Sequence, residues 1–257
     1  HNTIHAMNVV ITSEVVQAYS LCPRKAYLLM YGKERGMPHE YEQILRRHQF
    51  ANQAKNLELL KQKHTDVYPY SVSNLEKGYE FLIDVTLAAD NLQAYCSILA
   101  RVNNLSYELT IFIGTHTINN TDKLSLMFAS YVLTKIQGKS PAVGHIVNMK
   151  GESRRLKLEE SHKVLKPLLE PLQRWLSASS LEELPIILNK HCPVCQFREQ
   201  CQKKAIQEDN LSCLAHVTSK VIRRYERKGI FTVKQLSYLF KPRKRKKRSK
   251  NPPPIIH

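Results

Sequence analysis

The sequence predicts a mixed α/β fold, in which helices flank a central mixed sheet and a helical hairpin and a basic tail follow. Stretches rich in β-branched and aromatic residues alternate with stretches of helical periodicity over most of the chain. Two short helical patterns joined by a glycine come next, and the last residues are mostly Lys, Arg and Pro. With 257 residues, 42% of them hydrophobic, the chain can bury one large core and carry an appendage.

Helices and one pair of strands are expected in the first half of the chain. Residues 9–31 predict an extended entry and then a helix, which Ser13 can cap. An Asn-Asn turn signal at 103–104 separates two runs of β formers, so these runs should pair as antiparallel strands. The other expected elements are a polar helix over 41–64, an extended segment over 66–72, a helix over 75–84 capped by Asn74, and the two strands over 93–102 and 107–114.

The second half begins with an amphipathic helix over 122–137. Thr121 opens it, and Gly138 takes the C-cap position, where a left-handed backbone favours glycine. Gly229 joins two later short helices into a hairpin. The elements expected here are strands over 143–149 and 154–158, a helix over 160–178 kinked or split by Pro167 and Pro171, and short helices over 217–228 and 232–240, the last capped by Thr232.

Positive charge is concentrated at the C-terminal end. The chain carries +17, and from His216 to His257 it has 14 Lys and Arg residues and one acid, so this stretch alone carries +13. A patch of this density favours nucleic acid through counterion release, with a solvated tail as the alternative. The candidate nucleic-acid-binding residues are Arg223, Arg224, Arg227, Lys228, Lys241, Arg243, Lys244 and Arg245.

The composition predicts three parts. A main domain covers 8–207, and a helical hairpin covers 208–240 and either contacts a nucleic-acid backbone or packs on the main domain. Residues 241–257 form a basic, Pro-rich tail that cannot bury a core and is expected to be disordered. Met7 is a candidate natural start, and the abrupt C-terminal end is compatible with a fragment of a longer protein.

Three cysteines form a C-x2-C-x5-C pattern at Cys192, Cys195 and Cys201. The first two can bind one metal centre from a turn, and a helical turn over 196–200 can return the third to the same centre. Three thiolates leave a closed zinc site, or a four-cysteine iron–sulfur cluster, one ligand short. The pattern therefore predicts a fourth ligand elsewhere in the chain.

The other three cysteines carry a weaker signal. Because the chain shows no secretory signal, its cysteines are expected to be ligands or buried thiols rather than disulfides. Taken alone, Cys22 suits a buried apolar position, and Cys96 and Cys213 are expected to be ordinary buried thiols because they lack matching spacing. No apolar run approaches the roughly 20 residues of a membrane span, so a cytoplasmic protein without a membrane partner is expected.

The context of Cys22 points to a family. The sequence around it is Leu-Cys-Pro-Arg-Lys-Ala-Tyr-Leu, and the C-x2-C-x5-C pattern follows after about 170 residues. This cysteine frame resembles the iron–sulfur RecB-like nucleases of the PD-(D/E)XK class. The group includes the CRISPR-associated exonucleases, the AddB-type nuclease domains and helicase-fused RecB-like nucleases. The resemblance covers most of residues 9–240 and implies a restriction-endonuclease-like central sheet.

The same resemblance implies a cofactor. In it, Cys22, Cys192, Cys195 and Cys201 ligate a [4Fe–4S] cluster that ties the N-terminal helix to the C-terminal segment. Zinc on the same four cysteines, or on the last three together with His191, is the alternative. In either form the metal centre is expected to be structural.

The resemblance also implies the place of a nuclease site. In this fold one strand presents an Asp, and the next presents Glu or Asp, one further residue and then Lys. The carboxylates hold Mg²⁺ or Mn²⁺, which activates a water and stabilises charge on phosphate. The corresponding positions here are Ser97, Glu108 and Thr110, so only one of them is a carboxylate. Either Asp84 or Asp90 supplies the missing carboxylate in another register, or the site has lost its metal ligands.

The second explanation is simpler, since no Glu-x-Lys or Asp-x-Lys occurs between residues 75 and 150. The expected function is therefore a DNA-binding, iron–sulfur RecB-like protein of DNA repair, recombination or foreign-DNA processing, with a degenerate nuclease site. Two rivals stay open. One is an active exonuclease that uses Mg²⁺ or Mn²⁺, and the other is a zinc-stapled nucleic-acid adaptor, RNA included, without catalysis. A helicase or a larger repair complex is a possible further partner.

Overall fold

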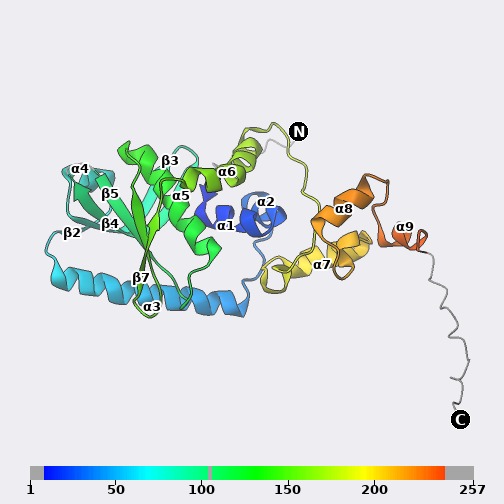
Figure 1. Ribbon diagram of the computed structural model, residues 1–257, viewed down its shortest axis with the longest axis horizontal. Helices are drawn as coiled ribbons and strands as arrows, with labels where there is room; N and C mark the ends of the chain where they lie inside the picture. Colours follow the sequence, from blue (N-terminus) through cyan, green and yellow to red (C-terminus); the bar gives the residue numbers. More distant parts are fainter. Residues whose placement is uncertain (1–8, 104–105, 241–257) are drawn as a thin grey trace, which may run out of the picture. The chain divides into compact units, whose positions relative to one another are not determined.

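The computed structural model describes residues 9–103 and 106–240 (Figure 1). Within them the chain forms two compact units. The first comprises residues 9–185 and 190–199, and the second comprises 186–189 and 200–240. Residues 241–257, and with them the expected tail, lie outside the described part.

A seven-stranded mixed sheet forms the centre of the first unit. The strand order is β2-β3-β4-β5-β6-β7, with β1 paired to the start of β4. The pairs β1/β4, β2/β3 and β5/β6 are parallel, and β3/β4, β4/β5 and β6/β7 are antiparallel. The strands are β1 Ile11–Thr12, β2 Val67–Pro69, β3 Phe81–Ala89, β4 Leu92–Asn103, β5 Ser106–Phe112, β6 Val143–Val147 and β7 Ser153–Lys157. The predicted fold class, with an antiparallel pair at its centre, is confirmed.

Helices cover both faces of this sheet (Figure 1). α5 packs across β3 to β6 and contacts α1 and α6, whereas α3 runs along the opposite face. The helices that begin in the first unit are α1 Ser13–Leu21, α2 Pro23–Tyr31, α3 Glu40–Lys63, α4 Val72–Lys77, α5 Asn120–Gln137, α6 Ser161–Ser177 and α7 Arg198–Gln207, with a 3₁₀ turn, η1, over Cys192–Val194. From Gln200 onward α7 belongs to the second unit.

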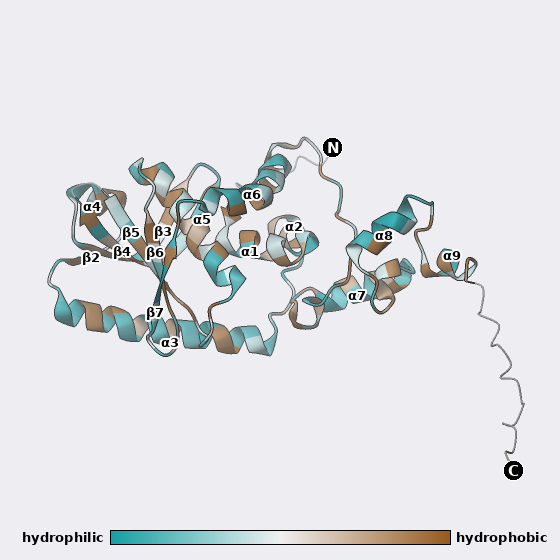
Figure 2. Ribbon diagram, viewed as in Figure 1, coloured by the Kyte–Doolittle hydropathy of each residue, from teal (hydrophilic) through white to brown (hydrophobic). Residues whose placement is uncertain are grey.

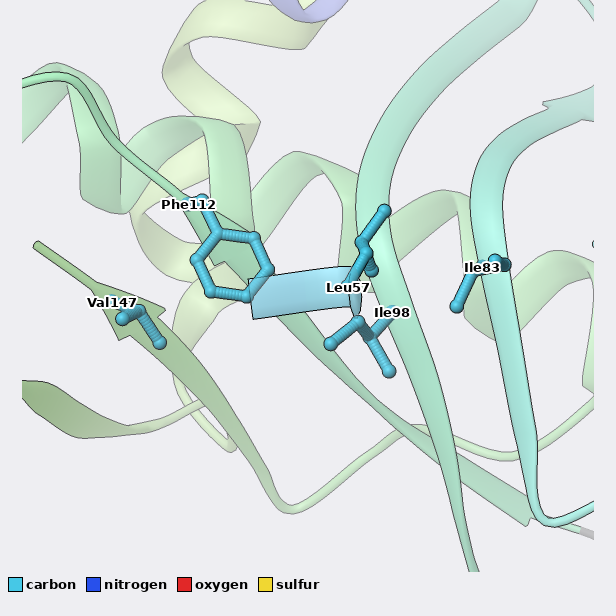
Figure 3. Close-up of a cluster of buried hydrophobic side chains, with 5 residues drawn as sticks. All are labelled: Leu57, Ile83, Ile98, Phe112 and Val147. Carbon is cyan, nitrogen blue, oxygen red and sulfur yellow. The ribbon is translucent and has the colours of Figure 1, made fainter. Parts of the chain in front are cut away.

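The polar helix α3 is attached to the sheet by a few buried side chains. Leu57 packs into a cluster with one residue from each of four strands, Ile83, Ile98, Phe112 and Val147 (Figure 3). Burying a side chain of this kind contributes about 1.5–3 kcal/mol. One turn earlier, the Asn52 side-chain amide donates hydrogen bonds to the backbone oxygens at the ends of β5 and β6, at 3.0–3.3 Å.

The prediction of a helix over 75–84 is wrong in its bounds and its cap. α4 begins at Val72, where the Ser71 hydroxyl rather than Asn74 provides the cap, and it ends at Gly78 with φ 73°. Residues 81–89 are β3, which buries alternate side chains and pairs with β4 through the turn at Asp90. Period-two alternation of apolar residues, which predicts a half-buried strand, therefore outweighed the cap signal.

The helix expected over 9–31 is two helices. Cys22 has extended backbone angles, φ −163° and ψ 112°, and separates α1 from α2. Pro23 explains the break, because a residue before proline is disfavoured in the helical region. The caps also differ from those expected, since Thr12 rather than Ser13 caps α1 and Asn119 rather than Thr121 caps α5. α6 continues through Pro167 and Pro171 without splitting.

The second unit is a small helical assembly. It contains a 3₁₀ turn, η2, over Leu211–Cys213, then α8 Ser219–Glu226 and α9 Val233–Ser237. Asp209 joins α9 to the unit, because its backbone oxygen accepts from the N–H of Val233 at 2.9 Å and its carboxylate accepts from the N–H of Lys234 at 2.7 Å. Gly229, with φ 77°, closes the expected hairpin, and the predicted Thr232 cap of α9 is confirmed.

No helix in the described part of the chain combines the length and the apolar composition needed to cross a membrane.

Candidate functional site

Ser97, which stands at the aspartate position of the expected nuclease site, is enclosed beneath α3. Only 1% of it is exposed, and its hydroxyl donates a hydrogen bond to Oε1 of Gln53 at 2.9 Å. Nε2 of Gln53 in turn donates to the Tyr95 hydroxyl at 2.5 Å. Burial raises the pKa of Tyr95. The hydrogen bond from Gln53 acts in the opposite direction, and the negative charge of Asp84 adds to the increase. The hydroxyl of Ser97 therefore holds the helix to the sheet.

Glu108 and Thr110 lie two residues apart on β5, where a strand presents both side chains on one face. Glu108 lies opposite Ala100, and Thr110 lies opposite Ile98. Continued by one residue, this register places Ser97 opposite Ile111, and not opposite Glu108 or Thr110. Oε2 of Glu108 is 3.8 Å from Nε2 of His145 on β6, so this half-buried carboxylate already has a neighbour.

The two alternative carboxylates occupy different environments. Asp90 is a turn residue between β3 and β4, with φ 51°, and its carboxylate lies 3.5 Å from Nζ of Lys135. Asp84 is exposed on β3 and also has φ 51°. It lies between the pairs Ile83–Ile98 and Val85–Cys96, so the register places it beside Ser97. Of these two carboxylates, Asp84 is the one that the sheet brings to the expected site.

A cavity of about 410 Å³ opens beside Ser97 in the first unit. Its lining comes from α1, the N-terminal half of α3, β4, the end of β5, the start of α5 and the segment around His191. Charged groups of both signs face it, including Glu14 and Arg46, whose charged atoms lie 3.6 Å apart. Asp122 also lines it, and burial raises the pKa of this carboxyl. Glu108 and Thr110 are not among its lining residues.

The sequence did not indicate this cavity or the role of Gln53. Both depend on α3 lying against the sheet, a tertiary contact that leaves no local pattern in a helix of mostly polar residues. Buried polar side chains such as Asn52 and Gln53 look like ordinary surface residues in the sequence, because only the contact with the sheet buries them.

Three of the four predicted cysteine ligands lie in the first unit. Cys22 separates α1 from α2, and Cys192 and Cys195 bracket the 3₁₀ turn, in which the N–H of Cys195 donates to the backbone oxygen of Cys192 at 3.1 Å. All three are partly exposed. Cys201 lies on α7 in the part that belongs to the second unit.

The segment that carries Cys192 and Cys195 is bound to the region that carries Cys22. Nζ of Lys25, in the first turn of α2, lies 3.0 Å from Nε2 of His191. Burial and this ammonium both lower the pKa of His191, so the neutral ring accepts the hydrogen bond. On the other side, Nε2 of Gln196 donates to the backbone oxygen of Arg35 at 2.5 Å. The donor chemistry of these thiols fits zinc or an iron–sulfur cluster.

Among residues 9–103 and 106–240, no group of three or more His, Cys, Asp or Glu side chains is placed to hold one metal ion. A shared centre on the four cysteines therefore stays a prediction. The two remaining cysteines differ from each other. Cys96 is fully buried, as expected, whereas the expectation that Cys213 is buried is wrong, because it is exposed at the end of η2. Leu211 and Ser212 take the buried side of this three-residue element, which leaves Cys213 on its exposed side.

α8 presents a basic face in the second unit. Ile222 is 4% exposed, whereas Lys220, Arg223 and Arg224 on the same helix are exposed, and α8 is mostly hydrophilic (Figure 2). Arg227, just after the helix, lines a shallow groove together with Lys220, Arg223 and Glu226. The exposed cations over 219–234 are Lys220, Arg223, Arg224, Arg227, Lys228 and Lys234. The tail residues Lys241, Arg243, Lys244 and Arg245 lie outside the described part.

Comparison with protein-family models gives no match to this chain, and no curated protein matches it.

Proposed function

We propose that this protein binds DNA and is built on a RecB-like nuclease domain whose catalytic site is degenerate. The observation that carries the proposal is the basic face of α8 together with the turn and the first residues of α9 after it, where six cations and one acid are exposed over 219–234. Arg and Lys side chains presented in this way bind phosphates and fix the position of a protein on nucleic acid. DNA repair, recombination or foreign-DNA processing is the proposed setting, in the cytoplasm, with a helicase or larger repair complex as a further partner.

The environment of Ser97 supports a degenerate site. A catalytic carboxylate at this position would need access to a metal ion and to phosphate. The residue present is a serine whose hydroxyl is buried and hydrogen-bonded to Gln53. Thr110 replaces the lysine that would position the water. The remaining carboxylate, Glu108, has no second carboxylate across the strand pair, because Ala100 lies opposite it.

The four cysteines are proposed to hold a [4Fe–4S] cluster, with zinc as the alternative. The contact between Lys25 and His191 supports this, because it joins a residue three positions after Cys22 to the residue just before Cys192. When bound, the group would supply a covalent clamp between distant segments and would stabilise the fold. Metal analysis and the visible spectrum of anaerobically purified protein test it. A broad absorbance near the blue end with about four irons per chain supports the cluster, and colourless protein with one zinc supports the alternative.

DNA binding is tested by fluorescence anisotropy with a labelled oligonucleotide. The expected result is binding whose affinity falls steeply with salt and is weakened by the double variant Arg223→Ala/Arg227→Ala. The matched control is Lys61→Ala/Lys63→Ala, which removes two exposed cations from the last turn of α3. Absence of salt-sensitive binding, or equal losses in both variants, contradicts the proposal.

A second candidate function is an active, metal-dependent exonuclease. The observation that favours it is the position of Asp84 beside Ser97, which leaves one carboxylate near the expected site. A nuclease assay on single-stranded and duplex DNA with Mg²⁺ or Mn²⁺ distinguishes the two functions. Cleavage that is lost in both Asp84→Asn and Glu108→Gln establishes this activity and overturns the degenerate site. No cleavage above a chelated control is the result expected here.

A further inference from the structure

An exposed aromatic ring stands on a fixed backbone at the turn between α8 and α9. Phe231 is 58% exposed. Its N–H donates to Oε1 of Gln235 at 2.7 Å, and the same oxygen accepts from the N–H of Thr232 at 3.2 Å. The Thr232 hydroxyl completes this capping box by accepting from the N–H of Gln235. The backbone that carries the ring is therefore held on both sides, while the ring itself faces solvent.

The turn is also anchored to its neighbours. The N–H of Ile230 donates to the backbone oxygen of Tyr225 at 3.0 Å, which folds the chain back on the end of α8. The N–H of Val233 donates to the backbone oxygen of Asp209 at 2.9 Å. Because these bonds fix the residues on each side of Phe231, the ring loses little backbone freedom when it binds a partner.

Cations flank this ring along the chain. Lys228 and Lys234 stand three residues before and after Phe231, and both are exposed. No Asp or Glu occurs anywhere from Arg227 to the C-terminus of the sequence. Further along, Tyr238 is 74% exposed at the end of α9. Aromatic rings and cations therefore alternate on one stretch of the second unit, which is the combination that binds single strands through stacked bases and paired phosphates.

We propose that Phe231, with Tyr238 and the surrounding cations, forms a stacking surface for single-stranded DNA. The inference rests on the proposed DNA binding and adds to it the form of the substrate. In a duplex the base faces are stacked inside the helix, so only the cations can contribute. A single strand offers its bases as well, and the ring then adds an interaction that tolerates any sequence. The charge complementarity favours an anionic strand over a protein partner.

The test compares the full chain with Phe231→Leu on three labelled probes: a single strand, a duplex and an abasic strand that has phosphates but no bases. Loss of stacking should weaken binding of the single strand about tenfold. Binding of the duplex and of the abasic strand should be unchanged. Phe231→Trp should keep the single-strand affinity of the wild-type chain, because indole also stacks on bases. The matched control is Phe50→Leu, which changes an exposed ring (70% exposed, against 58% for Phe231) on α3 in the first unit.

The possible outcomes separate this inference from the proposed function. If the wild-type chain binds none of the three probes, DNA binding itself is wrong and the stacking surface falls with it. If it binds all three and Phe231→Leu leaves the affinities unchanged, DNA binding stands and the stacking surface is wrong, which points to a protein as the partner of the ring. Equal losses on all three probes also overturn the inference, because stacking cannot act on an abasic strand.

Discussion

Two buried serine hydroxyls show how differently the same group can be used. The hydroxyl of Ser97 donates to Gln53 and helps to join β4 to α3. Among the described residues, the hydroxyl of Ser13 is buried without a hydrogen-bond partner. A buried polar group without a partner costs stability, whereas removing one partner of a buried pair leaves the other unsatisfied.

Ser97→Ala should therefore destabilise the protein, because Oε1 of Gln53 loses its donor in a buried site. The expected loss is about 1–3 kcal/mol in the free energy of unfolding, measured by urea denaturation. Ser13→Ala is the matched control, and it should be neutral or slightly stabilising because its hydroxyl has no bond to lose. Similar losses in the two variants would show that the bond between Ser97 and Gln53 contributes little.

The Asp122 carboxyl predicts a pH dependence of stability. Burial raises its pKa above the ordinary value of 3.8, so the folded state binds this proton more tightly than the unfolded state. Its contribution to stability is therefore present below that ordinary value and is lost as pH rises through the raised pKa.

Asp122→Asn removes this titration and keeps an amide oxygen that can accept from the N–H of Asn119. The difference in free energy of unfolding between the variant and the wild type should shift in favour of the variant as pH rises from about 3.5 to 6. Urea denaturation across that range measures it. A difference that stays constant with pH, or that moves in favour of the wild type, would contradict the shift.

At the level of elements, the cysteine segment is fitted closely to the loop after α2. Gly36 has φ 67°, and a Cβ atom there would lie 2.4 Å from the backbone oxygen of Gln196. Gly151 has a similar φ, 78°, but a Cβ atom at that position would meet nothing within 4 Å. Both glycines therefore have a left-handed backbone, but only Gly36 also lies too close to a neighbouring segment for a side chain.

Gly36→Ala should lower the free energy of unfolding by more than Gly151→Ala. Each variant pays roughly 1–2 kcal/mol for a left-handed backbone, and the first must also move the segment that carries Cys192 and Cys195. If the proposed cluster is present, Gly36→Ala should also purify with less bound metal per chain than Gly151→Ala. Urea denaturation and metal analysis give separate readouts, so equal stability of the two variants contradicts the contact whatever the metal content.

Several elements followed from local patterns in the sequence. The strands at the centre of the sheet have β formers on both sides of a turn, and the helix before Gly138 has both an apolar face and a C-cap. β3 does alternate apolar and polar residues from Ile83 to Leu87, but the helix predicted from the Asn74 cap overlaps the start of this strand. The break at Cys22 had a visible signal in Pro23, which the continuous apolar pattern concealed.

The candidate site was less accessible to such reasoning. The positions of Ser97, Glu108 and Thr110 came from a family resemblance, and their residue types could be read directly. The hydrogen-bond partner of Ser97 could not be predicted from the sequence, because Gln53 reaches Ser97 only when α3 lies across the sheet. A local pattern predicts which face of an element is buried, but it does not specify the partner that covers that face.

At the scale of the whole molecule, charge is divided unevenly between the two ends. The stretch from His216 onward carries +13 of the net +17. Part of that charge lies on α8 in the described second unit, and eight Lys and Arg residues lie in 241–250. Both groups are expected to contact phosphates, and the sequence of 241–250 contains no aromatic residue that could stack on bases. The tail should therefore add affinity that depends on salt and not on the form of the DNA.

Deleting residues 241–250 tests this division. Each phosphate contact contributes about −0.9 to the slope of log affinity against log salt concentration on duplex DNA. The deletion should make that slope shallower by several units, and it should weaken single-strand and duplex binding together. Anisotropy titrations at four salt concentrations measure both effects, with Lys61→Ala/Lys63→Ala as the charge control on the first unit. A slope that is unchanged by the deletion would mean that the tail does not contact DNA, and the basic face of α8 would then carry the electrostatic attraction alone.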